Sequence, residues 1–117
     1  MIYHADGVRA SIVCEGANDP VTPAADAILE EKGVLVLPDV LVNAGAVVVS
    51  YFEWVQGLQE YFWKEAEVNA KLNDIVVRAF NETWATRAGR GTSMRVAAYG
   101  VAVQRVAEAT TTRGLYP

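Results

Sequence analysis

Two asparagine side chains, each in a turn-like segment, are the polar groups of this sequence best placed to bind a ligand. Asn18 lies in the segment Glu15–Pro20 and Asn43 in the segment Pro38–Gly45, and each segment follows a short apolar run. If these runs are parallel strands, both segments lie beyond the carboxyl ends of the strands, where open α/β sheets bind ligands. An asparagine offers two N–H donors and one acceptor, which suits a carboxamide or a ribose hydroxyl.

The helix that could begin after Asn43 would add free N–H groups and a positive end, which favour an anion. Taken alone, however, the residue types favour simpler roles. Asn18 is then an ordinary turn residue and Asn43 a helix cap.

Other reactive groups are scarce. His4 and Cys14 are the single histidine and the single cysteine, too few for a metal site. We expect His4 in a frayed N-terminal segment and Cys14 as a small core residue of a strand, so they do not form a nucleophile–base pair. The pair Gly89 and Gly91 follows a predicted helix rather than a strand, and Met94 stands where a dinucleotide loop has its third glycine. We therefore predict no metal site and no catalytic residue.

The elements that must position the asparagines are a strand, a helix and a second strand. Residues 9–14 read as a strand followed by a turn. Thr22 can cap the next helix and Pro23 suits its first position, while Gly33 is a left-handed end for a helix over residues 24–32. The apolar run 34–37 is typical of a strand buried on both faces. This order predicts a βαβ unit with a right-handed crossover.

The second half of the chain reads as helical. Residues 40–62 are ambiguous, because the three valines at 47–49 favour a strand while Asn43 favours a helix start. A helix over roughly 64–87 has one apolar face, and residues 87–92 form a glycine-rich turn. A second helix begins at Thr92 or Ser93 and ends at Gly114. The apolar residues that mark the two helices are Val68, Leu72, Ile75, Val76, Ala79, Phe80 and Trp84, then Val96, Tyr99, Val103, Val106 and Ala107. We expect the two helices to pair as a hairpin, with the side chains of Trp84 and Tyr99 buried between them.

Composition limits the classes of function. The chain has 117 residues, which allows one small domain, and its net charge of −4 argues against nucleic acid and anionic membranes as partners. No apolar run reaches the about 20 residues of a spanning helix. One cysteine excludes a disulfide scaffold, and we expect a cytoplasmic protein. Residues 75–117 hold six arginines, which favours a solvated helix face over an acidic partner.

Several segments together resemble the glutamate dehydrogenase family, over nearly the whole chain from about Ala5 to Pro117. The matching segments read Val13-x-Glu15-Gly16-Ala17-Asn18-x-Pro20-x-Thr22-Pro23-x-Ala25-Asp26, Gly33-Val34-x-Val36-x-Pro38-Asp39, Asn43-Ala44-Gly45-x-Val47-x-Val49-Ser50-Tyr51-Phe52-Glu53-Trp54-x-Gln56, Ala97-Ala98-Tyr99-x-Val101-Ala102-Val103-x-Arg105-Val106-Ala107-Glu108-Ala109 and Arg113-Gly114-x-Tyr116-Pro117. In that family the Asn-Ala-Gly motif opens a long helix, so the resemblance implies a helix over residues 44–62.

The resemblance also implies roles. Asn18 and Asn43 match positions beside the nicotinamide of NAD or NADP, and Gly16 and Ala17 belong to the same cofactor-binding motif. Ser50 matches the hydroxyl that binds the distal carboxylate of glutamate. Val47 matches a residue of the substrate side-chain pocket, and it fits equally well as a core valine.

Three positions depart from the family pattern. Ala46 replaces a second glycine, and its methyl group could crowd a nicotinamide ring. Lys64 stands near the position where the family usually has a Ser or Thr cap, which costs the following helix about 1 kcal/mol. Asp19 replaces a small or apolar residue. The catalytic lysine, the acid–base aspartate and the pyrophosphate loop of the family fall outside the matching region, and Lys32, Lys64 and Lys71 have surface spacing.

The sequence therefore predicts an α/β fold: a partial Rossmann-like unit of two parallel strands followed by long C-terminal helices, helix-rich overall. We expect residues 1–62 to be the second half of a nucleotide-binding domain and 63–117 a helical hairpin packed on it, in one compact unit. The implied parent reaction is oxidative deamination of L-glutamate to 2-oxoglutarate with NAD(P), and we expect this chain alone to be inactive. The alternatives are a non-catalytic module that forms a homo-oligomer or docks to a dehydrogenase subunit, a split enzyme and a regulatory subunit.

Overall fold

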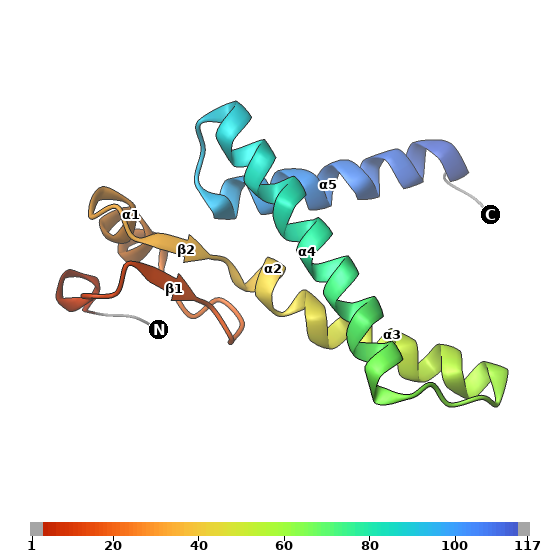
Figure 1. Ribbon diagram of the computed structural model, residues 1–117. Helices are drawn as coiled ribbons and strands as arrows, with labels where there is room; N and C mark the ends of the chain where they lie inside the picture. Colours follow the sequence, from red (N-terminus) through yellow and green to blue (C-terminus); the bar gives the residue numbers. More distant parts are fainter. Residues whose placement is uncertain (1–3, 115–117) are drawn as a thin grey trace.

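A parallel pair of short strands joined by a helix forms the first part of the fold. The computed structural model describes residues 4–114. In it, β1 (Ile12–Cys14) pairs with β2 (Leu35–Leu37), with Ile12 opposite Leu35 and Cys14 opposite Leu37. The helix α1 (Pro23–Glu31) provides the crossover that a parallel pair requires (Figure 1). The predicted two-stranded parallel unit in a helix-rich chain is confirmed.

The ends of α1 follow from its local sequence. Thr22 Oγ1 accepts a hydrogen bond from the N–H of Ala25 at 3.3 Å, and Pro23 occupies the first helical position. At the other end Gly33 has a φ of 72°, which a residue with a Cβ rarely adopts. This left-handed residue turns the chain directly into β2.

The segment before β1 is tied to α1 rather than frayed. It forms a short 3-10 turn, η1 (Ala5–Gly7), in which Ala5 is buried. Lys32 Nζ donates to the carbonyls of Ala5, Asp6 and Val8 at 3.3, 2.5 and 2.9 Å. The carbonyl of His4 accepts from the N–H of Gly7. The expectation that His4 lies in a frayed segment was therefore wrong.

The ambiguous middle segment is helical. A one-turn helix, α2 (Asp39–Val42), is followed by α3 (Ala44–Gln59), so residues 47–49 are helical despite their preference for strands. α3 ends three residues before the implied limit of 62, because Glu60 takes the left-handed conformation with a φ of 52°. Helical packing against α4 outweighs the propensity of the valines here.

The last two helices form the predicted hairpin. They are α4 (Glu65–Arg90) and α5 (Met94–Arg113), joined at Gly91, whose φ is 62°. The glycine-rich turn is shorter than predicted, because Gly89 is still part of α4. Ser93 rather than Thr92 caps α5, since Ser93 Oγ accepts from the N–H of Val96 at 3.2 Å. Gly114 ends α5 with a φ of 78°.

The two helices differ in which apolar face they bury. The predicted face of α4 is half-buried as far as Phe80, but Trp84 is 41% exposed. On α5 the buried residues are Met94, Ala97 and Ala98, whereas Tyr99 is 50% exposed. The predicted burial of Trp84 and Tyr99 was wrong. Tyr99 is exposed because α5 packs with its small residues Ala97 and Ala98 facing inward. The larger apolar residues Val96, Tyr99, Val103 and Val106 form an exposed stripe.

The buried core is small and lies around α1. Leu29 is fully buried there with Ala5, Val21 and Ala25. β2 is only half-buried, so the expectation of a strand covered on both faces was wrong. The radius of gyration is 17.0 Å, whereas a compact domain of this length has about 13 Å. Figure 1 shows the reason: α4 crosses from α3 at one end to the turn before α5, and α3 points away from the sheet.

Candidate functional site

The site is built on Glu15, the first residue after β1. Its N–H donates to the carbonyl of Leu37 at 3.1 Å, which extends the sheet by one step. Its side chain turns inward and is fully buried. Glu15 Oε2 accepts the N–H of Asp39 at 2.8 Å, so the carboxylate ties the end of β1 to the start of α2.

A buried carboxylate needs a charged partner, and Arg95 of α5 supplies it. Arg95 Nη2 donates to Glu15 Oε1 at 2.6 Å and Nη1 to Oε2 at 3.0 Å. The same guanidinium donates to Asp26 of α1, from Nε at 2.8 Å and from Nη2 at 3.1 Å. A third carboxylate, that of Asp39, lies 3.8 Å from Nη1. These hydrogen bonds raise the pKa of Arg95, so its charge is permanent. We refer to Arg95, Glu15, Asp26 and Asp39 as the Arg95 network.

Asp39 carries the network into the loop that holds Asn18. Its Oδ2 accepts the N–H of Asp19 at 2.8 Å and its Oδ1 the N–H of Val40 at 2.7 Å. The hydrogen bond from Asp19, followed by that from Val40 and the charge of Arg95, lowers the pKa of Asp39 below its ordinary value of 3.8. Asp19 itself has a φ of 44°, in the left-handed region.

Asn18 and Asn43, predicted from separate segments, are hydrogen-bonded to each other. Asn43 Nδ2 donates to Asn18 Oδ1 at 3.3 Å. Asn43 precedes α3, but its backbone is helical and its side chain makes no capping hydrogen bond. The simpler interpretation of Asn43 as a side-chain cap is therefore wrong. The pair leaves the Asn18 amide as donor and the Asn43 carbonyl as acceptor for a ligand.

The two asparagines line an open groove with a volume of about 560 Å³, which we name the Asn18–Asn43 groove. Its walls are mainly apolar. The lining residues are Asn18, Asp19, Asp39, Val40, Asn43, Ala44, Val47, Val48 and Tyr99. A few convergent polar groups on an apolar wall are the usual composition of a small-molecule site.

The structure brings together three of the six residues predicted for binding. Asn18, Asn43 and Val47 line the groove, and Val47 is 70% exposed, so it is not a core valine. Ser50 is exposed on α3 about one turn after Val47 and does not line the groove. Gly16 and Ala17 are exposed in the loop and are also outside the lining.

Sequence reasoning missed the Arg95 network. It also missed that Tyr99 of α5 lines the Asn18–Asn43 groove. Glu15 carried a readable signal, because an acidic residue directly after an apolar strand must find a partner if the loop is buried. The position of that partner was not readable, since Arg95 is 80 residues away in sequence. The arginine-rich end was expected to be a solvated face, yet Arg95 meets acidic groups of the same chain, and Arg105 pairs with Glu82.

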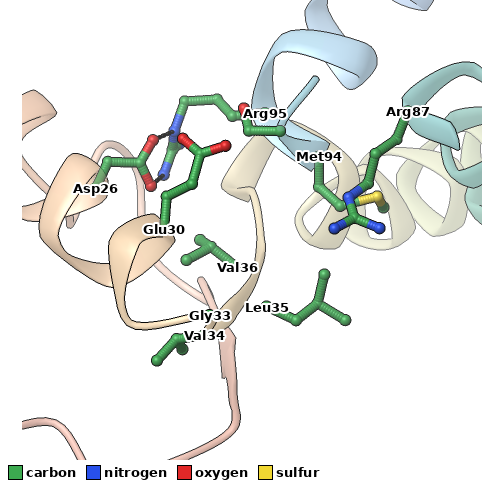
Figure 2. A pocket seen from close by; sticks show the side chains of 10 residues that line it. Asp26, Glu30, Gly33, Val34, Leu35, Val36, Arg87, Met94 and Arg95 are labelled. Carbon is green, nitrogen blue, oxygen red and sulfur yellow. Dashed lines mark hydrogen bonds and ion pairs between the residues drawn. The ribbon is translucent and has the colours of Figure 1, made fainter. Parts of the chain in front are cut away.

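A second, smaller cavity of about 110 Å³ is lined by Arg95 and by residues of α1, β2 and the start of α5. Figure 2 shows the Arg95–Asp26 ion pair at its edge, with Val34, Val36 and Met94 around it. None of the predicted site residues lines it.

Among residues 4–114, no cluster of three or more His, Cys, Asp or Glu side chains could hold a metal ion. Across the same residues, no helix combines the length and the apolar character that crossing a membrane requires.

Comparison with known proteins gives consistent matches. The family described as Glutamate/Leucine/Phenylalanine/Valine dehydrogenase matches residues 3–114. The glutamate dehydrogenase of Thermotoga maritima is 49% identical over 114 residues, which cover 97% of this chain and 27% of that protein. The NAD-specific glutamate dehydrogenase of Clostridioides difficile is 46% identical over 96% of this chain and 27% of its own length. The chain thus spans about a quarter of the curated relatives that it matches.

Solved structures match the fold as well. The crystal structure of glutamate dehydrogenase from Peptoniphilus asaccharolyticus superposes with a TM-score of 0.87 at 39% identity, over 96% of this chain and 28% of that one. The hetero-hexameric glutamate dehydrogenase from Thermus thermophilus, in a Leu-bound form, superposes with a TM-score of 0.90 at 39% identity, over 97% and 27%.

Proposed function

The chain belongs to the Glutamate/Leucine/Phenylalanine/Valine dehydrogenase family, and from this premise we propose that it provides the nicotinamide-facing C-terminal part of a glutamate dehydrogenase-type oxidoreductase. The reaction of the whole protein is then the reversible oxidative deamination of L-glutamate to 2-oxoglutarate with NAD or NADP. The observation that carries the proposal is the hydrogen-bonded Asn18–Asn43 pair in the lining of a mainly apolar groove.

The groups of this pair fit a nicotinamide carboxamide. The Asn18 amide can donate to the carboxamide oxygen, and the Asn43 carbonyl can accept from the carboxamide N–H group. Val40, Val48 and Tyr99 offer apolar surface for the ring. When bound, the nicotinamide supplies the hydride acceptor of the reaction. The chain's own residues orient the carboxamide and keep water away from one side of the ring.

Ala46 does not obstruct this arrangement. It replaces the second glycine of the family motif, and we expected its methyl group to crowd a nicotinamide ring. Ala46 is exposed and is not among the residues that line the groove. Ala44 and Val47 lie on the groove side of α3 instead.

Substrate contacts are proposed for Val47 and Ser50. They lie three positions apart on α3, so their side chains share one face of the helix. Val47 would contact the aliphatic part of the amino acid. The hydroxyl of Ser50 would donate to the distal carboxylate of glutamate.

We propose that this chain alone does not turn over glutamate. Deamination needs a lysine close to the amino group, and no lysine lines the groove in the described part of the chain. Lys32 donates to three backbone carbonyls next to α1, while Lys64 and Lys71 are exposed at α4. General acid–base catalysis contributes roughly 10²-fold to 10⁴-fold to a reaction rate, and this contribution is lost without a positioned acid–base group.

Titration of the ¹⁵N-labelled chain with NAD⁺, followed by NMR, tests the proposal. We expect the side-chain amide signals of Asn18 and Asn43 to shift, with a Kd on the order of millimolar for half of a site. Asn43→Ala should weaken binding about tenfold, the effect of one hydrogen bond. Asn69→Ala, an exposed asparagine on α4, is the matched control and should leave binding unchanged. Shifts confined to residues outside the groove would contradict the proposal.

A second function, as an oligomerising or docking module, is favoured by the exposed apolar surface. On α3 the residues Val47, Tyr51, Trp54 and Leu58 follow helical spacing and are 57–70% exposed. The α5 stripe includes Tyr99, which also lines the groove. Surfaces of this kind mark contacts with other protein. We propose that in the whole protein the rest of the polypeptide covers them, and that the isolated chain self-associates through them.

A further inference from the structure

We propose that Arg95 is a positioning residue, which holds the loop of Asn18 and the segment of Asn43 at a fixed separation from its place on α5. The importance of this positioning role for function rests on the nicotinamide site proposed above. Arg95 does not line the Asn18–Asn43 groove, so it acts through other residues.

Two routes of polar contacts lead from Arg95 to the asparagine segments, the first through hydrogen bonds and the second through an ion pair and a hydrogen bond. In the first, Arg95 binds Glu15, whose other contact is the N–H of Asp39 at the start of α2. α2 ends one residue before Asn43. The route therefore fixes the segment of Asn43 to the end of β1.

The second route leads to Asn18. Arg95 attracts the carboxylate of Asp39, which accepts the N–H of Asp19 at 2.8 Å. Asp19 follows Asn18 directly in the chain and has a left-handed backbone. A hydrogen bond at this residue therefore holds the unusual backbone conformation and with it the direction of the Asn18 side chain.

The geometry of the guanidinium makes this a specific role for arginine. Glu15 takes two of its N–H groups and Asp26 takes Nε and Nη2, so the fork is bound on two edges. A planar fork can hold two carboxylates at a fixed angle, whereas a lysine ammonium is a point charge without that constraint. The Glu15 side chain is fully buried, so its charge has no water to replace the arginine.

The experiment compares Arg95 with a matched arginine on the same helix. Arg105 also forms an ion pair, with Glu82 of α4, but both side chains are about half exposed. Arg95→Met, Arg95→Lys and Arg105→Met are prepared in the ¹⁵N-labelled full chain. Amide exchange of Asp19 and Asp39 is measured by NMR without nucleotide, with Val76 in the middle of α4 as a reference for global opening.

We expect Arg95→Met to speed exchange at Asp19 and Asp39 by about tenfold relative to Val76 and to shift the side-chain amides of Asn18 and Asn43. Arg95→Lys should give a smaller increase, and Arg105→Met none. Equal acceleration at Asp19, Asp39 and Val76 would show a purely structural role and overturn the inference. Unchanged exchange at Asp19 and Asp39 would also overturn it.

Glu15→Gln keeps the inference testable if Arg95→Met does not fold. It keeps the size of the side chain but removes the charge, and we expect the same local acceleration at Asp39. Because exchange is measured without nucleotide, it is independent of cofactor binding. If the wild-type chain binds no NAD⁺, the proposed function fails while the exchange result still decides the role of Arg95. If Arg95→Met binds NAD⁺ as the wild type does and its loop amides are unchanged, only the positioning role fails.

Discussion

At the scale of single residues, the molecule collects three carboxylates around one guanidinium. Glu15, Asp26 and Asp39 would repel one another, but each is compensated by Arg95, and Glu15 and Asp39 also accept backbone N–H groups. Hydrogen bonds to the charged form stabilise a carboxylate in its ionised state. The hydrogen bonds that Asp39 accepts thus lower the pKa of its carboxyl group and favour its charged form next to Arg95.

Asp39 should make stability depend on pH in the acid range. Its pKa in the folded chain is lowered below 3.8, first by the hydrogen bond from Asp19. A lowered pKa stabilises the fold above the unfolded pKa, and this contribution is lost as the pH falls through the folded pKa. Asp39→Asn should therefore be less stable than the wild type at about pH 7, and the difference should shrink below about pH 4. Urea unfolding over this range measures it.

Asp74→Asn is the control for this pH experiment. Asp74 is exposed on α4, and a surface substitution of this kind changes stability by less than about 0.5 kcal/mol. If Asp39→Asn keeps the same deficit at low pH as at neutral pH, the loss comes from something other than its ionised form.

At the scale of elements, two helix ends carry residues that suit them poorly. Lys64 is the N-cap of α4, and its ammonium group cannot accept a hydrogen bond. Glu67 Oε2 accepts the N–H of Lys64 at 3.0 Å, so only one half of a capping box exists. At the end of α3, Glu60 occupies a left-handed position that favours glycine.

Replacing the cap should stabilise α4. The N–H of Glu67 donates to the backbone carbonyl of Lys64 at 2.9 Å. Lys64→Ser adds a side-chain acceptor for the free N–H groups of the first turn and should raise the free energy of unfolding by about 1 kcal/mol. Thermal unfolding followed by circular dichroism measures the change. Lys64→Ala removes the same ammonium without adding an acceptor, so an equal gain in that variant would contradict the capping explanation.

Replacing the left-handed residue should also stabilise the chain. Glu60→Gly removes the steric cost of a Cβ at a φ of 52°, which we expect to raise the free energy of unfolding by about 1 kcal/mol. Glu60→Ala is the matched variant, because it removes the charge but keeps the Cβ. Chemical denaturation of the three proteins separates the two contributions, and an equal effect of Ala and Gly would rule out the backbone argument.

The sequence predicts those parts of the fold that depend on residues close together in the chain, and it predicts poorly those that depend on contacts between distant elements. Thr22, Pro23 and Gly33 act on their neighbours, so the ends of α1 were predictable from them. The helical state of the valines at 47–49 needed a family resemblance, because packing against α4 decides it. The sequence predicted that the valine face of α5 is buried, whereas the structure buries its alanine face. Alanine and valine are both apolar, so only packing against the neighbouring elements decides which face is buried.

The candidate site shows the same limit. Asn18 and Asn43 were predicted because both follow the carboxyl ends of strands, but their mutual hydrogen bond and the contribution of Arg95 were not. These contacts join residues 25 and 80 positions apart. A pattern in one segment contains no information about a partner at that distance in the chain.

At the scale of the whole molecule, much apolar surface is exposed and the shape is extended. The radius of gyration of 17.0 Å exceeds the value of about 13 Å for a compact domain of this length. The exposed stripes of α3 and α5, the mostly exposed β1 and the half-buried β2 contribute to this surface.

Self-association should therefore depend on the α5 stripe. Burying one valine contributes roughly 1.5–3 kcal/mol, so Val103→Asp should weaken association by at least about tenfold. Gln104→Asp introduces the same charge at the next position and is the matched control. Size-exclusion chromatography with light scattering over a range of concentrations measures both variants, and equal weakening would show a charge effect rather than loss of an apolar contact.

The long sequence separation between Glu15 and Arg95 has a consequence for synthesis on the ribosome. Glu15 emerges before its partner, which follows 80 residues later, so its carboxylate stays hydrated until α5 has left the exit tunnel. Domains acquire their long-range contacts only when the required segments are available. The loop of Asn18 is thus ordered only after α5 is made, although it is made before α1, α3 and α4. In a nascent chain that ends before Arg95, α1 can form but the asparagine pair cannot be held in place.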